Sequence, residues 1–171
     1  QTFTLQTVNT ISNDTTNWSL GRPTPPTVTS TLPDSTSDVR TTSAVIDYLK
    51  CRTDSQTGEP ASATLKVATS FSYDDCGNID VATVVGKNPD GTDMAGRSVT
   101  RDFGSRCQFP ETVTNPLGQS STIAYLNDLG LQQTVTDPNG LVSQQTFDVF
   151  GRSDVITRPD GTDIDIDLMA R

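Results

Sequence analysis

Aspartates are the residues of this sequence whose spacing best suits chemistry. Asp74 and Asp75 are adjacent, and Asp163, Asp165 and Asp167 alternate, which would place them on one face of a strand. Such carboxylates can bind a hard cation or act as the acid and base of a glycosidase. The alternating run lacks the glycine and the closing glutamate of an EF-hand loop. We therefore favour a turn aspartate and a solvated strand face, and we predict no metal and no cofactor.

Histidine is absent from the chain. Its absence excludes Ser-His-Asp and Cys-His arrangements and the usual zinc hydrolases, which are the commonest routes to hydrolysis. We therefore expect no catalytic residue, and we expect that the chain is not an enzyme.

Trp18 is the one tryptophan of the chain, and it lies close to Leu20 and Pro23. A single tryptophan can be a stacking platform for sugars, but we favour a packing anchor. The sequences Asn13-Asp14-Thr15 and Asn17-Trp18-Ser19 match the N-glycosylation sequon, which indicates little beyond surface exposure.

The elements that must position these residues are marked by repeated turns. An x-Pro-x-Gly tetrapeptide recurs with glycines 27, 22 and 21 residues apart. Proline presets φ for the first corner and glycine tolerates positive φ, as a type I or type II turn requires. The four pairs are Pro89 with Gly91, Pro116 with Gly118, Pro138 with Gly140, and Pro159 with Gly161.

A second glycine series lies between these turns, 14, 14, 10 and 10 residues before the following Pro-x-Gly glycine. Its members are Gly77, Gly104, Gly130 and Gly151. We infer that each repeat has two turns of different kinds. The intervening segments have β character, namely 81–85, 112–114, 134–136, 142–147 and 154–157. Asp163 to Leu168 alternates, which predicts one more strand with Ile164, Ile166 and Leu168 facing inward and the carboxylates outward.

The composition favours an all-β wall. Apolar residues make up 32% and aromatic residues 6%, which is too little for a thick globular core. We therefore predict stacked antiparallel hairpins in one continuous sheet over 41–171, preceded by a turn-rich segment with short strands over 1–40. Ala44–Lys50 is the one segment that suits a short helix, but we favour a strand at 45–48.

The three cysteines Cys51, Cys76 and Cys107 show no C-x-x-C spacing, which argues against a structural zinc centre. An odd number allows at most one internal disulfide. In an oxidising compartment we expect Cys76 to pair with Cys107, because both lie near corresponding turns of successive repeats. The alternative, which we favour, is three buried free thiols.

The charge excludes several partners. Twenty-one acidic against twelve basic side chains give a net charge of -9, so nucleic acid and anionic membrane surfaces are poor partners. No apolar run approaches the ~20 residues that span a bilayer, so we expect no membrane insertion, and no signal peptide is recognisable. Because the chain begins at Gln1, we expect an excised or processed piece of a larger protein.

Two segments carry a resemblance to a known family. Phe71 to Asn78 and Phe147 to Arg152 have the aromatic-Asp-x-x-Gly-Asn/Arg form that resembles the YD repeat of bacterial Rhs proteins and of related insecticidal toxin complex subunits. In 100–104 and 126–130 the motif is degenerate. The structural repeat motif is predicted to comprise Tyr73, Asp74, Gly77, Phe147, Asp148, Gly151 and Arg152, together with the four Pro-Gly pairs.

The physical role of the motif can be stated from its residue types. The aromatic at the strand end covers a neighbouring layer, the aspartate accepts hydrogen bonds from turn N–H groups, and the glycine supplies positive φ. The resemblance implies a curved sheet, part of a spiral shell of a secreted or cell-surface polymorphic toxin. Such a shell encloses a toxic polypeptide. Asp137-Pro138 is followed by the next repeat, so we do not extend the self-cleavage of some family members to this chain.

An alternative function is an extracellular adhesive or glycan-binding β-repeat, or a subunit that joins copies of itself into a fibre. An open stack of hairpins leaves edge strands that can pair with other repeats of the parent chain or with a second copy.

Overall fold

The computed structural model describes residues 3–23, 27–126 and 129–166. Strands joined by short turns make up most of these residues, and the one helical segment among them is a 3-10 turn, η1 (Gly104–Arg106). No helix in the described part of the chain is long and apolar enough to cross a membrane. The sequence predicts this result, because segments rich in Thr, Val and Ser lie between turns that contain Pro and Gly.

The first forty residues form two small sheets. One has the order β1-β4-β5, and the other pairs β2 with β3. The strands are β1 (Thr4–Val8), β2 (Ile11–Asp14), β3 (Ser19–Pro23), β4 (Thr27–Thr31) and β5 (Ser37–Arg40).

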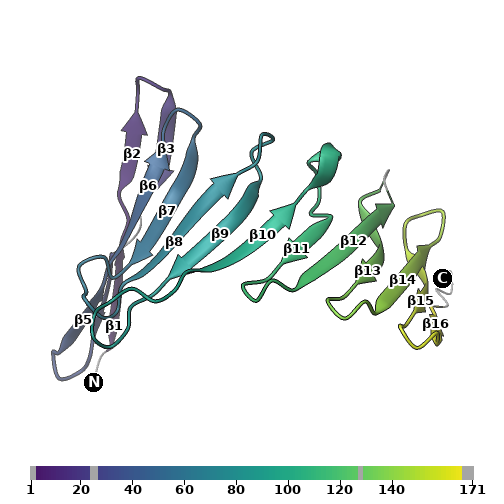
Figure 1. The fold of residues 1–171 in the computed structure, drawn as a ribbon. Helices are drawn as coiled ribbons and strands as arrows, with labels where there is room; N and C mark the ends of the chain where they lie inside the picture. The colour runs from purple at the N-terminus through teal and green to yellow at the C-terminus, as the bar shows by residue number, and fades with distance from the viewer. Residues whose placement is uncertain (1–2, 24–26, 127–128, 167–171) are drawn as a thin grey trace. The chain divides into compact units, whose positions relative to one another are not determined.

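The remaining strands form one sheet of eleven strands in sequence order, β6 to β16 (Figure 1). The strand pairs β6–β7, β7–β8 and each successive pair from β10–β11 to β15–β16 are antiparallel, as hairpins require. The prediction of an all-β chain of antiparallel hairpins is confirmed. The strands are β6 (Thr42–Asp47), β7 (Arg52–Gly58), β8 (Val67–Tyr73), β9 (Ile79–Val85), β10 (Arg97–Asp102), β11 (Thr112–Thr114), β12 (Ser120–Leu126), β13 (Leu131–Thr136), β14 (Val142–Phe147), β15 (Ser153–Thr157) and β16 (Asp163–Asp165).

Two compact units can be distinguished, residues 1–72 with 82–98, and residues 73–81 with 99–171. The change from the small sheets to the long sheet falls between Arg40 and Thr42. The strand that was favoured over a helix at 45–48 is confirmed, because β6 includes residues 45–47.

The second unit presents two different sheet faces. Thr112, Thr122 and Thr136 lie opposite one another on successive strands, so one face carries a row of hydroxyl groups. Ile123 pairs with Val135, one residue away along each strand, so the opposite face carries apolar side chains. The sheet therefore has a polar face and an apolar face at this place.

The sheet has no enclosed apolar core in the described residues, where Ser19 alone is buried, with 1% of its surface exposed. Trp18 is 80% exposed, so the prediction of a packing anchor is wrong; it lies in the β2–β3 turn with φ of 54°. Ile164 is also exposed, at 37%, which contradicts an inward-facing side chain. Asp167 and Leu168 lie outside the described residues. The low apolar content correctly predicted a thin wall, but a single layer leaves few places for a side chain to be covered.

Candidate functional site

The turns share one five-residue frame. In each, the N–H of position 1 donates to the carbonyl of position 5 over 2.8 to 3.0 Å, and the N–H of position 4 donates to the carbonyl of position 1 over 2.9 to 3.1 Å. We call these seven segments the regular turns. They are residues 32–36, 74–78, 88–92, 115–119, 137–141, 148–152 and 158–162.

Position 4 of every regular turn has positive φ. It is a glycine in six turns, with φ from 75° to 89°, and Ser35 in the seventh, with φ of 69°. No residue at position 3 has positive φ, which excludes a type II turn. The frame is therefore a type I turn followed by a left-handed residue in a G1 bulge. The inference of two turns of different kinds is wrong for Gly77 and Gly151, which share the frame of the Pro-Gly turns, whereas Gly104 and Gly130 of the same series lie outside this frame.

The first side-chain class of regular turn has an acceptor at position 1. Asp137 Oδ1 accepts from the N–H groups of Asn139 and Leu141, each at 2.8 Å. Asp74, Asn115 and Asp148 make the same pair of bonds in their turns. These donors stabilise the ionised carboxylate and so lower the pKa of each of the three aspartates. The largest cause of the lowered pKa is the Leu141 N–H for Asp137 and the Asn78 side chain for Asp74. For Asp148 it is the Arg152 N–H.

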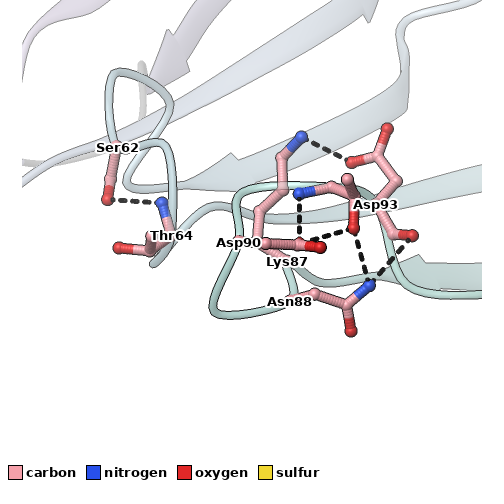
Figure 2. Close-up of polar contacts among 7 residues, drawn as sticks. Ser62, Thr64, Lys87, Asn88, Asp90 and Asp93 are labelled. Carbon is pink, nitrogen blue, oxygen red and sulfur yellow. Dashed lines mark hydrogen bonds and ion pairs between the residues drawn. The ribbon is translucent and has the colours of Figure 1, made fainter.

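The second class has its acceptor at position 3 and a threonine at position 5. Asp90 Oδ1 accepts from the Thr92 N–H at 2.9 Å and from the Thr92 hydroxyl at 2.6 Å (Figure 2). Asp34 with Thr36 and Asp160 with Thr162 repeat these distances. The threonine hydroxyl is the largest cause of the lowered pKa of all three aspartates.

The turn at 88–92 has additional polar contacts at its flanks. Lys87 Nζ lies 2.7 Å from Asp93 Oδ1, and this hydrogen bond lowers the pKa of Asp93 (Figure 2). Asn88 Nδ2 donates to the Thr92 hydroxyl at 2.9 Å. Asp93 is largely exposed, and an ion pair with a solvated partner contributes little to stability, so the backbone bonds of the frame stabilise the turn.

The turn at 32–36 was not predicted, because its position 4 is Ser35 and not a glycine. A signal was present, since Pro33-Asp34-x-Thr36 matches Pro89-Asp90-x-Thr92 and Pro159-Asp160-x-Thr162. The aspartate and threonine pair, with the preceding proline, identifies this class better than the glycine does.

The predicted motif residues all lie at regular turns or at the strand ends beside them. Tyr73 and Phe147 are the last residues of β8 and β14, and both are partly covered. Arg152 Nε and Nη2 lie 2.7 and 2.6 Å from Asp148 Oδ2, and the guanidinium lies 5.2 Å from the centre of the Phe150 ring. The eight Pro and Gly residues of the first series occupy positions 2 and 4 of four regular turns. The aspartates thus accept turn N–H groups, as the motif chemistry predicts.

Among the connections that depart from the frame are the two whose motif is degenerate. Residues 103–111 join β10 to β11 through η1, and Asp102 Oδ1 accepts only the Gly104 N–H there. At the β12–β13 connection, the N–H groups of Leu129 and Gly130 both donate to the Leu126 carbonyl. We call these the irregular connections.

A disulfide fixes the longer irregular connection. Cys107 pairs with Cys76 of the turn at 74–78, with their Cα atoms 6.1 Å apart. Asn78 Nδ2 also donates to the Cys107 carbonyl at 3.0 Å. The pairing is the one expected for an oxidising compartment, and three buried free thiols are wrong, since the remaining Cys51 is exposed.

The irregular connections enclose a cleft of about 320 Å³. Phe109 stacks on Tyr125 with ring centres 5.1 Å apart, and the Tyr125 hydroxyl donates to the Pro110 carbonyl at 3.0 Å. Gly130 lies so close to the Phe109 ring that a β-carbon would overlap it. The lining residues are Phe103, Arg106, Gln108, Phe109, Glu111, Ile123, Ala124, Tyr125 and Gly130. Sequence reasoning missed this cleft, because its residues converge from two degenerate repeats.

The carboxylates considered for catalysis lie in two separate segments, the turn at 74–78 and β16. Both oxygens of Asp74 accept hydrogen bonds within its turn, and its lowered pKa opposes a role as general acid. Asp163 and Asp165 are exposed on β16. The Asp74 carboxylate lies within 4.8 Å of the Cys76 and Cys107 sulfurs, but a disulfide offers no thiolate to a metal.

Comparison with known proteins gives a distant structural likeness. No family model matches the sequence, and no curated protein matches it. A solved chain described as "Crystal Structure of TcdB2-TccC3-TEV" is similar to this chain with a TM-score of 0.45 and 12% sequence identity. The similarity covers 92% of this chain and 10% of the solved chain, so this chain spans about a tenth of the length of that protein.

Proposed function

We propose that the chain is a structural wall segment of an Rhs/YD-repeat toxin shell that encloses a toxic polypeptide, and that it catalyses no reaction. One observation carries the proposal: seven turns with the same hydrogen-bonded frame join strands that follow one another in sequence order. A repeated hairpin of this kind extends a sheet by two strands at each step. The frame includes both segments that resemble the YD motif, at Asp74 and at Asp148.

The absence of an enclosed core supports a wall that is completed by other polypeptide. On the strands, Val45 is 60% exposed and Val67 is 45% exposed, and only Ser19 is buried among the residues that the structure describes. A single-layer sheet with exposed apolar side chains gains stability when another layer or an enclosed chain covers one face. We infer that partners of this chain are further repeats of the parent protein and the enclosed polypeptide.

The disulfide supports a secreted or cell-surface location. Structural disulfides persist in oxidising compartments and are rare in the cytosol. The Cys76–Cys107 bond therefore agrees with export of the parent protein.

The test compares the two sheet faces in the complete gene product. Thr134 and Val135 are neighbours on β13 and point to opposite faces, so each is replaced by cysteine in a Cys51→Ser background. A small maleimide and a maleimide with a long polyethylene glycol chain are then applied. We expect that the bulky reagent labels only one of the two positions in the assembled protein and both positions in the isolated chain. Equal labelling of both by the bulky reagent in the assembled protein would rule out a closed wall.

The fibre alternative is tested by self-association. Within the described residues, β6 has β7 as its only sheet neighbour, so one of its edges is open to another strand. Size-exclusion chromatography at several concentrations separates the two functions. A wall segment elutes as a monomer at every concentration, whereas a fibre subunit shifts to larger species as concentration rises.

A further inference from the structure

The cleft between the irregular connections lies at a place where the sheet departs from its repeat. The regular turns contain five residues, but the connection at 103–111 is longer and places aromatic and charged side chains beside β12. A wall needs no such extension. The side chains of this connection therefore indicate a role beyond that of a wall, and this role is independent of the proposed function.

The apolar part of the cleft is held in place before any ligand arrives. Phe109 is fixed between Tyr125 and the backbone of Gly130, and the Tyr125 hydroxyl is anchored on Pro110. The Cys76–Cys107 disulfide anchors the connection that carries Phe109. Phe109 nonetheless keeps 43% of its surface exposed, so a ligand can contact the ring. Aromatic surface that is fixed in advance binds with little loss of side-chain entropy.

The polar part of the cleft consists of three planar groups, the guanidinium of Arg106, the amide of Gln108 and the carboxylate of Glu111. Each side chain is exposed, and none of the three has a hydrogen bond or ion pair with another residue that the structure describes. The Glu111 carboxylate lies over Gly104, where a β-carbon would overlap it, so the missing side chain of Gly104 makes room for it. These groups supply donors and acceptors toward the same opening.

The charges of the cleft select against ions. Arg106 and Glu111 cancel, and the whole chain carries a net charge of -9, which repels anions. The guanidinium disfavours a metal cation at the same place. A purely apolar ligand would leave the three polar groups without partners. A neutral ligand with many hydroxyl groups and an apolar face satisfies the aromatic and the polar groups together.

We propose that this cleft binds a neutral saccharide. The apolar C–H face of a sugar ring contacts Phe109, and vicinal hydroxyls bond with Arg106, Gln108 and Glu111. The volume of about 320 Å³ lies at the small end of ligand pockets, which run from ~300 to 1,000 Å³, and suits a mono- or disaccharide.

The experiment titrates the isotope-labelled chain with neutral disaccharides and follows backbone amide signals by NMR. The probes are lactose, maltose, cellobiose and diacetylchitobiose, with glycine as a zwitterionic probe and citrate as an anionic one. We expect at least one sugar to shift amides of residues 103–111 and 123–126 and to leave those of the regular turns unchanged. No shift with any sugar overturns the proposal, and so does a shift in the cleft with glycine or citrate alone.

Matched variants test the assigned groups. Glu111→Gln and Arg106→Gln each remove one charged partner from an exposed side chain, and each is expected to weaken sugar binding about tenfold. Glu59→Gln and Arg158→Gln remove the same residue types outside the cleft and should leave the affinity unchanged. Equal affinity of the cleft variants and these controls would contradict the site, while spectra that superimpose outside the cleft verify that the variants are folded.

Discussion

The regular turns and the irregular connections satisfy their backbone groups in different ways. In a regular turn, two backbone hydrogen bonds and one acceptor side chain lie within five residues. The connection at 103–111 instead depends on residues far away in sequence, namely Cys76, Asn78 and Tyr125. The regular turns are therefore local structures that can join any pair of antiparallel strands. The connection at 103–111 instead keeps its conformation only through contacts with residues distant in sequence.

This difference separates the two roles proposed for the molecule. A turn held by its own residues can recur along the chain and is insensitive to substitutions outside it, which suits a wall built from repeats. A connection held by distant contacts keeps Phe109 and Glu111 in fixed positions, which suits a binding cleft. The variants below test whether stability is local at the first kind of site and long-range at the second.

Removal of the disulfide has the largest expected effect. Cys76→Ser with Cys107→Ser frees a loop with a sequence separation of 31 and is expected to lower the free energy of unfolding by about 3–4 kcal/mol, chiefly because the unfolded chain gains freedom. Urea denaturation measures the change. Cys51→Ser, which removes the exposed free thiol, is the control and should have no effect. Equal free energies of unfolding for the double variant and the control would show that the disulfide does not stabilise the connection at 103–111.

Two glycine variants compare the two kinds of site directly. Gly130→Ala adds a β-carbon that overlaps the Phe109 ring at φ of 66°, and it is expected to cost about 2–3 kcal/mol. Gly140→Ala meets no atom within 4 Å at φ of 80°, so only backbone strain of about 1–2 kcal/mol applies. Thermal or urea unfolding of both variants gives the comparison. A larger loss of stability with Gly140→Ala than with Gly130→Ala would show that the packing of Phe109 on Gly130 does not contribute to the free energy of unfolding.

The strands and most of the turns could be predicted from the sequence. Pro and Gly restrict or widen φ at their own positions, so the residues that determine a five-residue turn lie within that turn. Position 4 was recognisable as Gly118 or Gly140 but not as Ser35, since serine is rarely left-handed. The cleft was not predictable. Phe109, Gly130 and Tyr125 lie together because of the strand register and the bulge between Ala124 and Tyr125. Neither the register nor the bulge can be predicted from the type of a single residue.

Ser35 offers a reciprocal test of the shared frame. Ser35→Gly relieves a non-glycine residue at φ of 69° and is expected to stabilise the chain by about 1 kcal/mol. Gly161→Ser places the same residue in an equivalent turn with open space around it and should destabilise by a similar amount. Opposite signs in urea denaturation support one frame for both turns. A loss of stability with Ser35→Gly would mean that the serine turn has another geometry.

The smallest expected effect is the pH dependence of the turn aspartates. The pKa of Asp137 is lowered, chiefly by the Leu141 N–H, so its contribution to stability is present above the unfolded pKa of about 4 and is lost as pH falls through the folded pKa. Asn115 makes the same two bonds with an amide, which does not titrate in this range.

Acidification through the lowered folded pKa of Asp137 should therefore weaken the bond from the Leu141 N–H and leave the bond from the Gln119 N–H intact. NMR titration of these two amide signals measures the difference, and Asp137→Asn should make Leu141 as insensitive to acid as Gln119. An equal response of both amides in the unmodified chain would show that protonation of the side chain does not control the turn, and that the regular turns are held by their backbone hydrogen bonds alone.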